Sequence, residues 1–150
     1  MTDLSAFAEL VPLEHGLCVI STVRKDGSIH SAVVNAGILP HPFTGDEAVG
    51  LVAVGGTRKL DHLRADPRAT VLVRAGWRWA AVEGTAELVG PDDPHPNIDS
   101  ETLRHLLQAI FKAAGGTHDD WSTYDKAMVD ERRTAVLLAP RRIYTNPQST

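Results

Sequence analysis

A glycine pair and a short charged segment, Gly55-Gly56-Thr57-Arg58-Lys59-Leu60-Asp61-His62-Leu63-Arg64-Ala65-Asp66-Pro67-Arg68, separate two apolar runs at 49–54 and 69–73. Each run has the length of a buried strand, so the pattern predicts a strand, a glycine turn, one short helix and a second strand. Paired glycines let the backbone approach a ligand, and the start of a helix favours negative charge. We therefore expect a phosphate or carboxylate site at this turn, formed by Gly56, Thr57, Arg58 and Lys59.

Positive charge is concentrated in this part of the chain. Residues 58–78 contain six Lys and Arg against two acidic residues, whereas the whole chain has a formal net charge of −4. Arg64 and Arg68 have a plainer interpretation as solvated surface residues of a helix that ends at Asp66-Pro67, because proline disfavours helical geometry in the residue before it. His62 lies on nearly the same helix face as the lysine of the turn and is a candidate ligand contact.

The composition is that of an ordinary globular protein. The 150 residues, 43 % hydrophobic and 23 % charged, fit one domain over residues 1–150 with a sizeable core. The basic cluster is short and lies in an acidic background, which argues against nucleic-acid binding. The one cysteine, Cys18, lies in an apolar run and favours a buried residue in a reducing compartment. Residues 1–11 lack a signal-peptide pattern and no stretch has membrane-spanning length, so we expect a cytoplasmic protein without a membrane partner.

Antiparallel strands dominate the first half. Apolar runs at 17–23 and 29–39 flank Asp26-Gly27, and Asp-Gly is a strong hairpin signal. Thr2 or Asp3 is predicted to cap a short amphipathic helix that Pro12 ends. Further strands are predicted at 47–54, 69–74 and 77–89. Because strands and helices do not alternate, the pattern favours a small antiparallel barrel with peripheral helices over a doubly wound fold.

The second half predicts a helical insert at about 99–130, before the last strand. Asp99 or Ser100 can cap a first helix that ends at Gly115-Gly116, and Asp119 or Asp120 can cap a second. The last strand is predicted at 133–139 and 142–145, broken by Pro140, and residues 147–150 as a frayed tail. Side chains fill a barrel of this size, so a large cofactor is expected outside it, in a groove completed by a second subunit. A homodimer is therefore expected.

Strand residues supply the remaining candidates. If Trp77 and Trp79 share one strand face, they offer a flat surface to a ring system while Arg78 reaches a phosphate; alternatively, the tryptophans cover the barrel and Arg78 is solvated. Ser31 and Asn35 share a face by parity, and they either cap the barrel rim or address the heteroatoms of a ligand.

Catalytic and metal-binding signatures are not evident. The seven histidines have no metal-ligand spacing, so no metal site is expected. No carboxylate pair, histidine dyad or activated nucleophile stands out either. Trp121 and Tyr124 are interpreted as helix-packing residues, with shaping of a substrate pocket as the alternative. Such a pocket is expected from the N-terminal helix, the 40–46 loop and the 115–124 segment.

Several short motifs occur together in a consistent order from about residue 5 to residue 147. They are Ser21-Thr22-x-Arg24-x-Asp26-Gly27, Thr57-Arg58-Lys59, Leu63-Arg64-Ala65-Asp66-Pro67-Arg68, Val82-Glu83-Gly84-Thr85-Ala86, His118-Asp119-Asp120-Trp121 and Arg142-Ile143-Tyr144. With these motifs the chain resembles the flavin/deazaflavin oxidoreductases of the split β-barrel superfamily related to pyridoxamine-phosphate oxidase, in particular the B-type deazaflavin branch of actinobacteria.

This resemblance implies a homodimeric split β-barrel that holds coenzyme F420, or FMN as in some relatives, between its subunits. In the family pattern Lys59 contacts the cofactor phosphate, and Thr57 and Arg58 line the same turn. His62 stands where close relatives more often have asparagine. Residues 77–79 match the strand that borders the cofactor on its other side, and Asn35 matches the strand that faces the deazaflavin ring.

The implied reaction is hydride transfer from F420H2 to an electron-poor double bond of a small molecule, with no side-chain acid or base. Three alternatives remain open. They are an FMN-dependent oxidase or reductase on the same fold, a non-catalytic protein that binds a flavin or deazaflavin, and a barrel with a general anion-binding or structural role.

Overall fold

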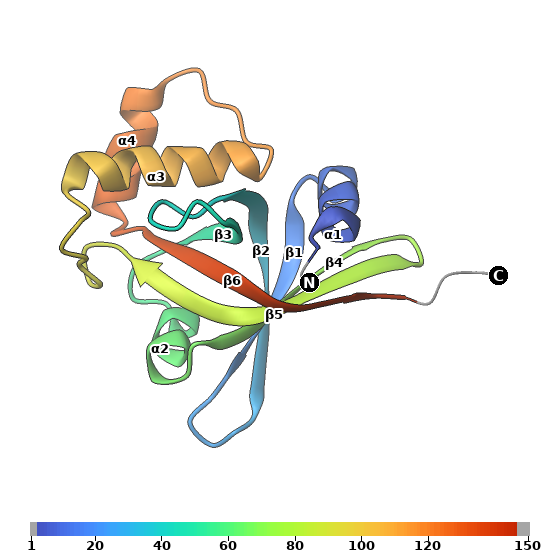
Figure 1. Ribbon diagram of the computed structural model, residues 1–150. Coiled ribbons are helices and arrows are strands. Elements are labelled where there is room, and N and C mark those ends of the chain that lie inside the picture. The colour runs from blue at the N-terminus through green and yellow to red at the C-terminus, as the bar shows by residue number, and fades with distance from the viewer. Residues whose placement is uncertain (1–2, 147–150) are drawn as a thin grey trace.

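Within residues 3–146, which the computed structural model describes, six antiparallel strands close into a barrel with the neighbour order β1-β2-β3-β6-β5-β4 (Figure 1). The strands are β1 (Leu17–Val23), β2 (Ile29–Pro40), β3 (Glu47–Ala53), β4 (Arg68–Ala75), β5 (Arg78–Val89) and β6 (Thr134–Thr145). This confirms the predicted antiparallel split barrel with peripheral helices. Thr2 as a helix cap and the predicted frayed tail at 147–150 lie outside the described residues.

Side chains fill the interior of the barrel. Along β1 the buried residues alternate with more exposed ones, as expected of a strand with one face toward a core. Inward side chains from every strand meet in one cluster, which includes Ile20, Val34, Leu51, Val71, Val82 and Leu138. A large ligand therefore has to bind on the outside of the barrel.

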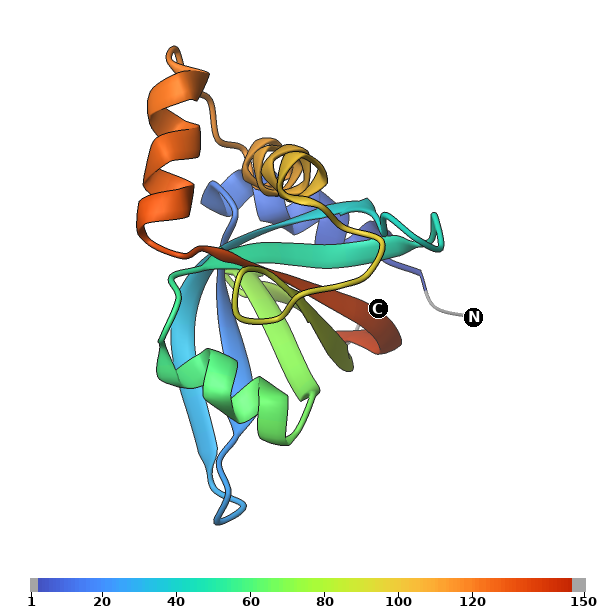
Figure 2. The ribbon, with the colours of Figure 1, turned by 90° about the vertical axis from the view of Figure 1, so that its left-hand side faces the viewer.

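Two short helical segments add to this core from different sides. Helix α1 (Ser5–Leu10) contributes Phe7, and helix α2 (Arg58–Ala65) contributes Leu60 and Leu63. Figure 2 shows α2 beside the strands of the first hairpin, in the lower half of the view, and α1 near the top of the barrel. Helix α2 is thus held against the barrel by two leucines on one face, which leaves its opposite face and its N-terminus available to solvent.

Helices α3 (Ser100–Ala113) and α4 (Trp121–Asp130) lie between β5 and β6 in the chain, outside the barrel (Figure 1). Their predicted caps are confirmed: Asp99 accepts a hydrogen bond from the backbone N–H of Thr102 at 2.8 Å, and Asp120 accepts one from the N–H of Thr123 at 3.2 Å. A second apolar cluster joins α3 to the outer face of the barrel and includes Leu39, Val89, Leu106, Leu107, Ile110 and Leu137.

The predicted break of the last strand at Pro140 is wrong. Strand β6 continues through Pro140, which lies opposite Gly84, while Arg142 lies opposite Glu83. The register shift between these pairs is a β-bulge, where a residue without an N–H is tolerated because the ladder is already interrupted. The proline marks a bend of the strand, not its end.

The N-terminal α-helix ends at Leu10, before Pro12, as predicted, and the chain continues in the 3-10 turn η1 (Val11–Glu14), where a proline in the first turn loses no hydrogen bond. One other predicted boundary is corrected. Trp77 is not part of β5, since Gly76 has a positive φ of 64° and the two residues form the β4–β5 turn. In residues 3–146 no helix is both long and apolar enough to cross a membrane.

Candidate functional site

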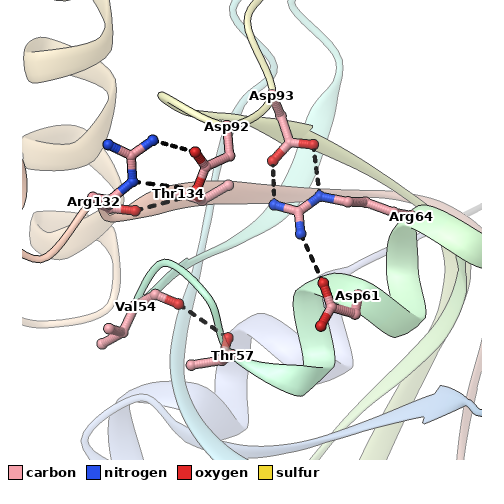
Figure 3. A network of polar contacts seen from close by, with 8 residues as sticks. All are labelled: Val54, Thr57, Asp61, Arg64, Asp92, Asp93, Arg132 and Thr134. Carbon is pink, nitrogen blue, oxygen red and sulfur yellow. Dashed lines mark hydrogen bonds and ion pairs between the residues drawn. The ribbon is translucent and has the colours of Figure 1, made fainter.

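The glycine turn before α2 has a backbone that only glycine accommodates. Gly56 has a φ of 80°, and a Cβ on Gly55 would lie 2.6 Å from the carbonyl oxygen of Arg132. Thr57 occupies the N-cap position of α2, but its hydroxyl donates to the carbonyl of Val54 at 3.0 Å and does not cap the helix (Figure 3). The first N–H groups of α2 therefore keep their capacity to bind an anion.

Arg58 and Lys59 follow directly on this turn. Arg58 is exposed and Lys59 is half-buried, and among residues 3–146 neither forms an ion pair. Two unneutralised cations at the positive end of a helix dipole attract negative charge. The geometry thus brings together Gly56, Thr57, Arg58 and Lys59.

His62 lies one turn further along α2 and contacts residues of the first hairpin. Its Nδ1 lies 3.1 Å from the hydroxyl of Thr22, and its ring meets that of His30 edge-on at 5.1 Å between centroids. Thr22 and His30 are direct partners in the β1–β2 register. The sequence analysis missed both residues as site candidates, although the Asp26-Gly27 turn sets this register and so predicts that they are opposite.

The positive charge of this region affects the protonation of the His30 side chain. Within the described part of the chain its Nδ1 is buried without a hydrogen-bond partner. Desolvation lowers the pKa of His30 below its ordinary value, and the positive charges of Arg24, His62, Lys59 and Arg58 lower it further. A neutral imidazole near these cations can donate a hydrogen bond from its ring N–H to a bound anion.

Arg64 and Arg68, which the sequence suggested were solvated surface residues, are each paired with carboxylates. Arg64 donates to both carboxylate oxygens of Asp93, at 2.9 and 2.7 Å, and to Asp61 at 3.0 Å (Figure 3). Arg68 pairs with Asp66, whose extended backbone ends α2 before Pro67 as predicted. Of the three Lys and Arg residues of α2, Arg58 and Lys59 are therefore the two without a carboxylate partner in the described part of the chain.

The structure does not bring residues 77–79 to this turn within one chain. Trp77 is 94 % exposed at the tip of the β4–β5 hairpin, and Arg78 pairs with Glu9 of α1 at 2.9 Å. Trp79 packs edge-on against Tyr144 at 5.9 Å between ring centroids. In Figure 1 this hairpin tip and α2 lie on opposite sides of the barrel. A site that uses both regions requires a second subunit.

Ser31 and Asn35 lie on the outer face of β2, at different distances from α2. The hydroxyl of Ser31 is 2.9 Å from that of Ser21 on β1. With its nitrogen toward the surrounding carbonyls, the Asn35 amide lies 3.2 Å from the carbonyl oxygens of His15, Gly16 and Ala114, to which its two N–H groups donate. Asn35 thus ties the N-terminal segment to the end of α3.

Asn35 also borders a small cavity of about 200 Å³ between β2, β3 and the helices α3 and α4. The aromatic rings of Phe111, Trp121 and Tyr124 pack against one another beside it, with centroids 4.9–6.0 Å apart. The Tyr124 hydroxyl donates to the carbonyl of Leu107 at 3.2 Å, and burial raises the pKa of Tyr124 to about 12. These contacts fit the packing interpretation of Trp121 and Tyr124.

The expected substrate pocket does not form as one unit in this chain. The N-terminal segment and the end of α3 meet around Asn35. The 40–46 loop lies elsewhere, because His41 bonds to Glu87 at 2.8 Å and Phe43 stacks on His95 at 4.2 Å.

The model of the family described as Pyridoxamine 5'-phosphate oxidase matches residues 5–146, nearly the whole chain. The chain belongs to the pyridoxamine 5'-phosphate oxidase family.

Solved structures share the fold of this family member at low sequence identity. A conserved hypothetical protein of Mycobacterium tuberculosis, Rv2991, is 20 % identical with a TM-score of 0.67, over 100 % of this chain and 92 % of its own. A pyridoxamine 5'-phosphate oxidase-related, FMN-binding protein of Nostoc punctiforme is 12 % identical with a TM-score of 0.63, over 97 % and 84 %. A protein named F420 reductase is 16 % identical with a TM-score of 0.55, over 85 % and 88 %. At these identities the likeness concerns the fold.

Two further features bear on the chemistry of this pyridoxamine 5'-phosphate oxidase family member. Over residues 3–146 no three His, Cys, Asp or Glu side chains are grouped so that they could hold a metal ion. Cys18 is buried, and desolvation raises the pKa of its thiol to about 12, so the thiol stays protonated at neutral pH.

Proposed function

We propose that this protein is an F420-dependent oxidoreductase whose cofactor phosphate binds at the N-terminus of α2. One observation carries the proposal: Arg58 and Lys59, without ion-pair partners among residues 3–146, are the first two residues of a helix that the Thr57 side chain does not cap. Membership in the pyridoxamine 5'-phosphate oxidase family supports it, as does the fold shared with a protein named F420 reductase.

The residues around α2 fit a phosphate group. The glycine turn allows a close approach of the backbone, and His30 has a buried ring nitrogen that lacks a partner in the described residues. In this proposal Lys59 and Arg58 bind the phosphate oxygens, and Thr57 and Gly56 line the turn. His62 is held by Thr22 beside the turn.

When bound, reduced F420 supplies a hydride for an electron-poor double bond of a small-molecule substrate. The chain's own contribution is position and electrostatics. In this proposal the proton comes from solvent. The protonated thiol of Cys18 takes no part, and its presence as the one cysteine supports a reducing compartment such as the cytoplasm.

We further propose a homodimer that completes the cofactor groove. Apolar side chains lie exposed on the outer face of β1 and β2, where Leu17, Ile29 and Val33 are 53 %, 59 % and 69 % exposed. Burial of such a face by a second copy removes apolar surface from water. A second copy could also bring its residues 77–79 to the α2 turn, which one chain does not.

The proposal is tested by titrating the purified protein with coenzyme F420 and, separately, with FMN, while following tryptophan fluorescence. We expect tighter binding of F420, and a Lys59→Ala variant should bind it with about 1.5–3 kcal/mol less free energy, because a charge-assisted contact is lost. The matched control is Lys126→Ala, since Lys126 pairs with Asp130 on the surface of α4.

The alternatives give different results in the same experiment. Preference for FMN would favour a flavin oxidase or reductase, and tight F420 binding without turnover of any acceptor would favour a non-catalytic binder. If Lys59→Ala keeps the affinity of the parent protein, the phosphate assignment is wrong.

A further inference from the structure

A second cavity, of about 570 Å³, lies between α3, α4 and the segment that follows β5. It contains none of the residues assigned to the α2 turn. Its volume falls within the range of small-molecule sites in proteins. The apolar part of its lining includes Val89, Ile98, Leu103, Leu107, Met128 and Val129.

The apolar lining residues are buried at the base of the cavity and become more exposed toward its rim. Val89 and Leu107 are almost completely buried, whereas Ile98, Leu103 and Met128 are half-buried and Val129 is 76 % exposed. Half-buried apolar side chains around a concave surface gain favourable free energy when an apolar molecule displaces water from them. The base of the cavity therefore selects for apolar surface on its ligand.

The arginines of the rim are already paired with carboxylates. Three arginines reach the cavity, and each forms an ion pair with at least one carboxylate. The pairs are Arg104 with Glu101 and Asp125, Arg132 with Asp92, and Arg133 with Glu131. An anionic ligand would have to lose its hydration without gaining an unpaired cation, so the rim disfavours anions.

One wall of the cavity is held in place by the β2–β3 loop. His95, which lines the cavity, stacks against Phe43 at 4.2 Å with only 18° between the ring planes. The loop is fixed in turn by His41, whose Nε2 lies 2.8 Å from Glu87 and whose Nδ1 accepts a hydrogen bond from the N–H of Phe43 at 3.1 Å. A wall that is ordered beforehand lowers the entropic cost of binding.

We propose that this cavity is a binding site for an uncharged, predominantly apolar small molecule. The site is separate from the anion site at α2. The segment between them carries Asp92, which bonds to Arg132 at the cavity, and Asp93, which bonds to Arg64 of α2 (Figure 3).

A pair of fluorescent probes tests the proposal directly. N-phenyl-1-naphthylamine is uncharged, and 8-anilino-1-naphthalenesulfonate has the same ring systems with an added sulfonate. We expect saturable binding of the uncharged probe to the folded protein, and an affinity for the sulfonate that is lower by about tenfold or more, because the rim offers it no unpaired cation.

Variants tie the binding to the cavity. Ile98→Trp places a larger side chain in the cavity and should weaken binding of the uncharged probe by about tenfold. Leu13→Trp is the matched control, since Leu13 is 60 % exposed on η1 and lies outside the cavity. Asp92→Asn leaves Arg132 without its carboxylate and should raise the affinity for the sulfonate relative to the uncharged probe.

The proposal is overturned if the parent protein shows no saturable binding of the uncharged probe. It also fails if Ile98→Trp, with a thermal unfolding midpoint like that of the parent, binds that probe unchanged. Loss of probe affinity as the protein concentration rises would mean that a second copy covers the cavity, which contradicts a small-molecule site.

Discussion

The α2 turn and the α3–α4 cavity use charged residues in opposite ways. At α2, Arg58 and Lys59 lack ion-pair partners among the described residues and lie beside a neutral His30. Around the cavity, every lining arginine has a carboxylate partner. The number of basic residues near a site is therefore a poor guide to the charge of its ligand, and the state of their partners is a better one.

The largest expected effect is the loss of stability when a buried leucine of either region is changed to alanine. Leu60 and Leu107 are both buried, at 0 % and 3 % exposure, but Leu60 holds α2 on the barrel and Leu107 lies under the cavity. Each change to alanine should lower the free energy of unfolding by about 2–5 kcal/mol, measured by urea denaturation.

The affinities for phosphate and for the uncharged probe should then differ between these two variants, measured at a temperature where both remain folded. Leu60→Ala should weaken phosphate binding more than probe binding, and Leu107→Ala the reverse. Equal losses of both ligands in both variants would show that the two regions are not separate sites.

A smaller effect distinguishes a paired arginine from one without a partner. Arg64→Ala removes the two bonds to Asp93, both side chains being partly buried, and should cost about 1 kcal/mol of unfolding free energy while changing phosphate affinity little. Arg58→Ala should do the opposite, weakening binding of inorganic phosphate without a measurable change in stability. Calorimetric titration measures the phosphate affinity of both variants, and urea denaturation measures their free energy of unfolding. Equal changes of both quantities in the two variants would contradict the distinction between paired and unpaired arginines.

The smallest effect concerns protonation at α2. Because desolvation and neighbouring cations lower the pKa of His30 in the folded state, the unfolded chain binds a proton there at higher pH than the folded one. Stability from this group is therefore present above a pH of about 6.5 and is lost as the pH falls below it.

His30→Gln should flatten that decline in stability between neutral and acidic pH. A bound phosphate should raise the pKa of His30, because its negative charge offsets the cations, and NMR titration of the histidine rings with and without phosphate measures the shift. An unchanged pKa in the presence of saturating phosphate would argue that the anion binds elsewhere.

Much of the fold follows from local sequence patterns. Apolar alternation and the Asp26-Gly27 turn predict the β1–β2 hairpin, and Asp99 and Asp120 predict the starts of α3 and α4. The prediction failed at Pro140, because a proline reads as a strand break unless the partner strand supplies a bulge. A bulge is a property of two strands and is not visible in one.

The sequence by itself determined the elements of this protein and the location of its basic turn, because strand alternation, caps and glycine turns depend on residues within a few positions of one another. Only the tertiary structure decided which charges are available. Arg64 finds its partner Asp93 only after β4 and β5 have formed, and His30 meets His62 only when α2 packs against the first hairpin. Whether a charged residue binds a ligand or a neighbour depends on contacts between distant segments, and closure of the barrel creates those contacts.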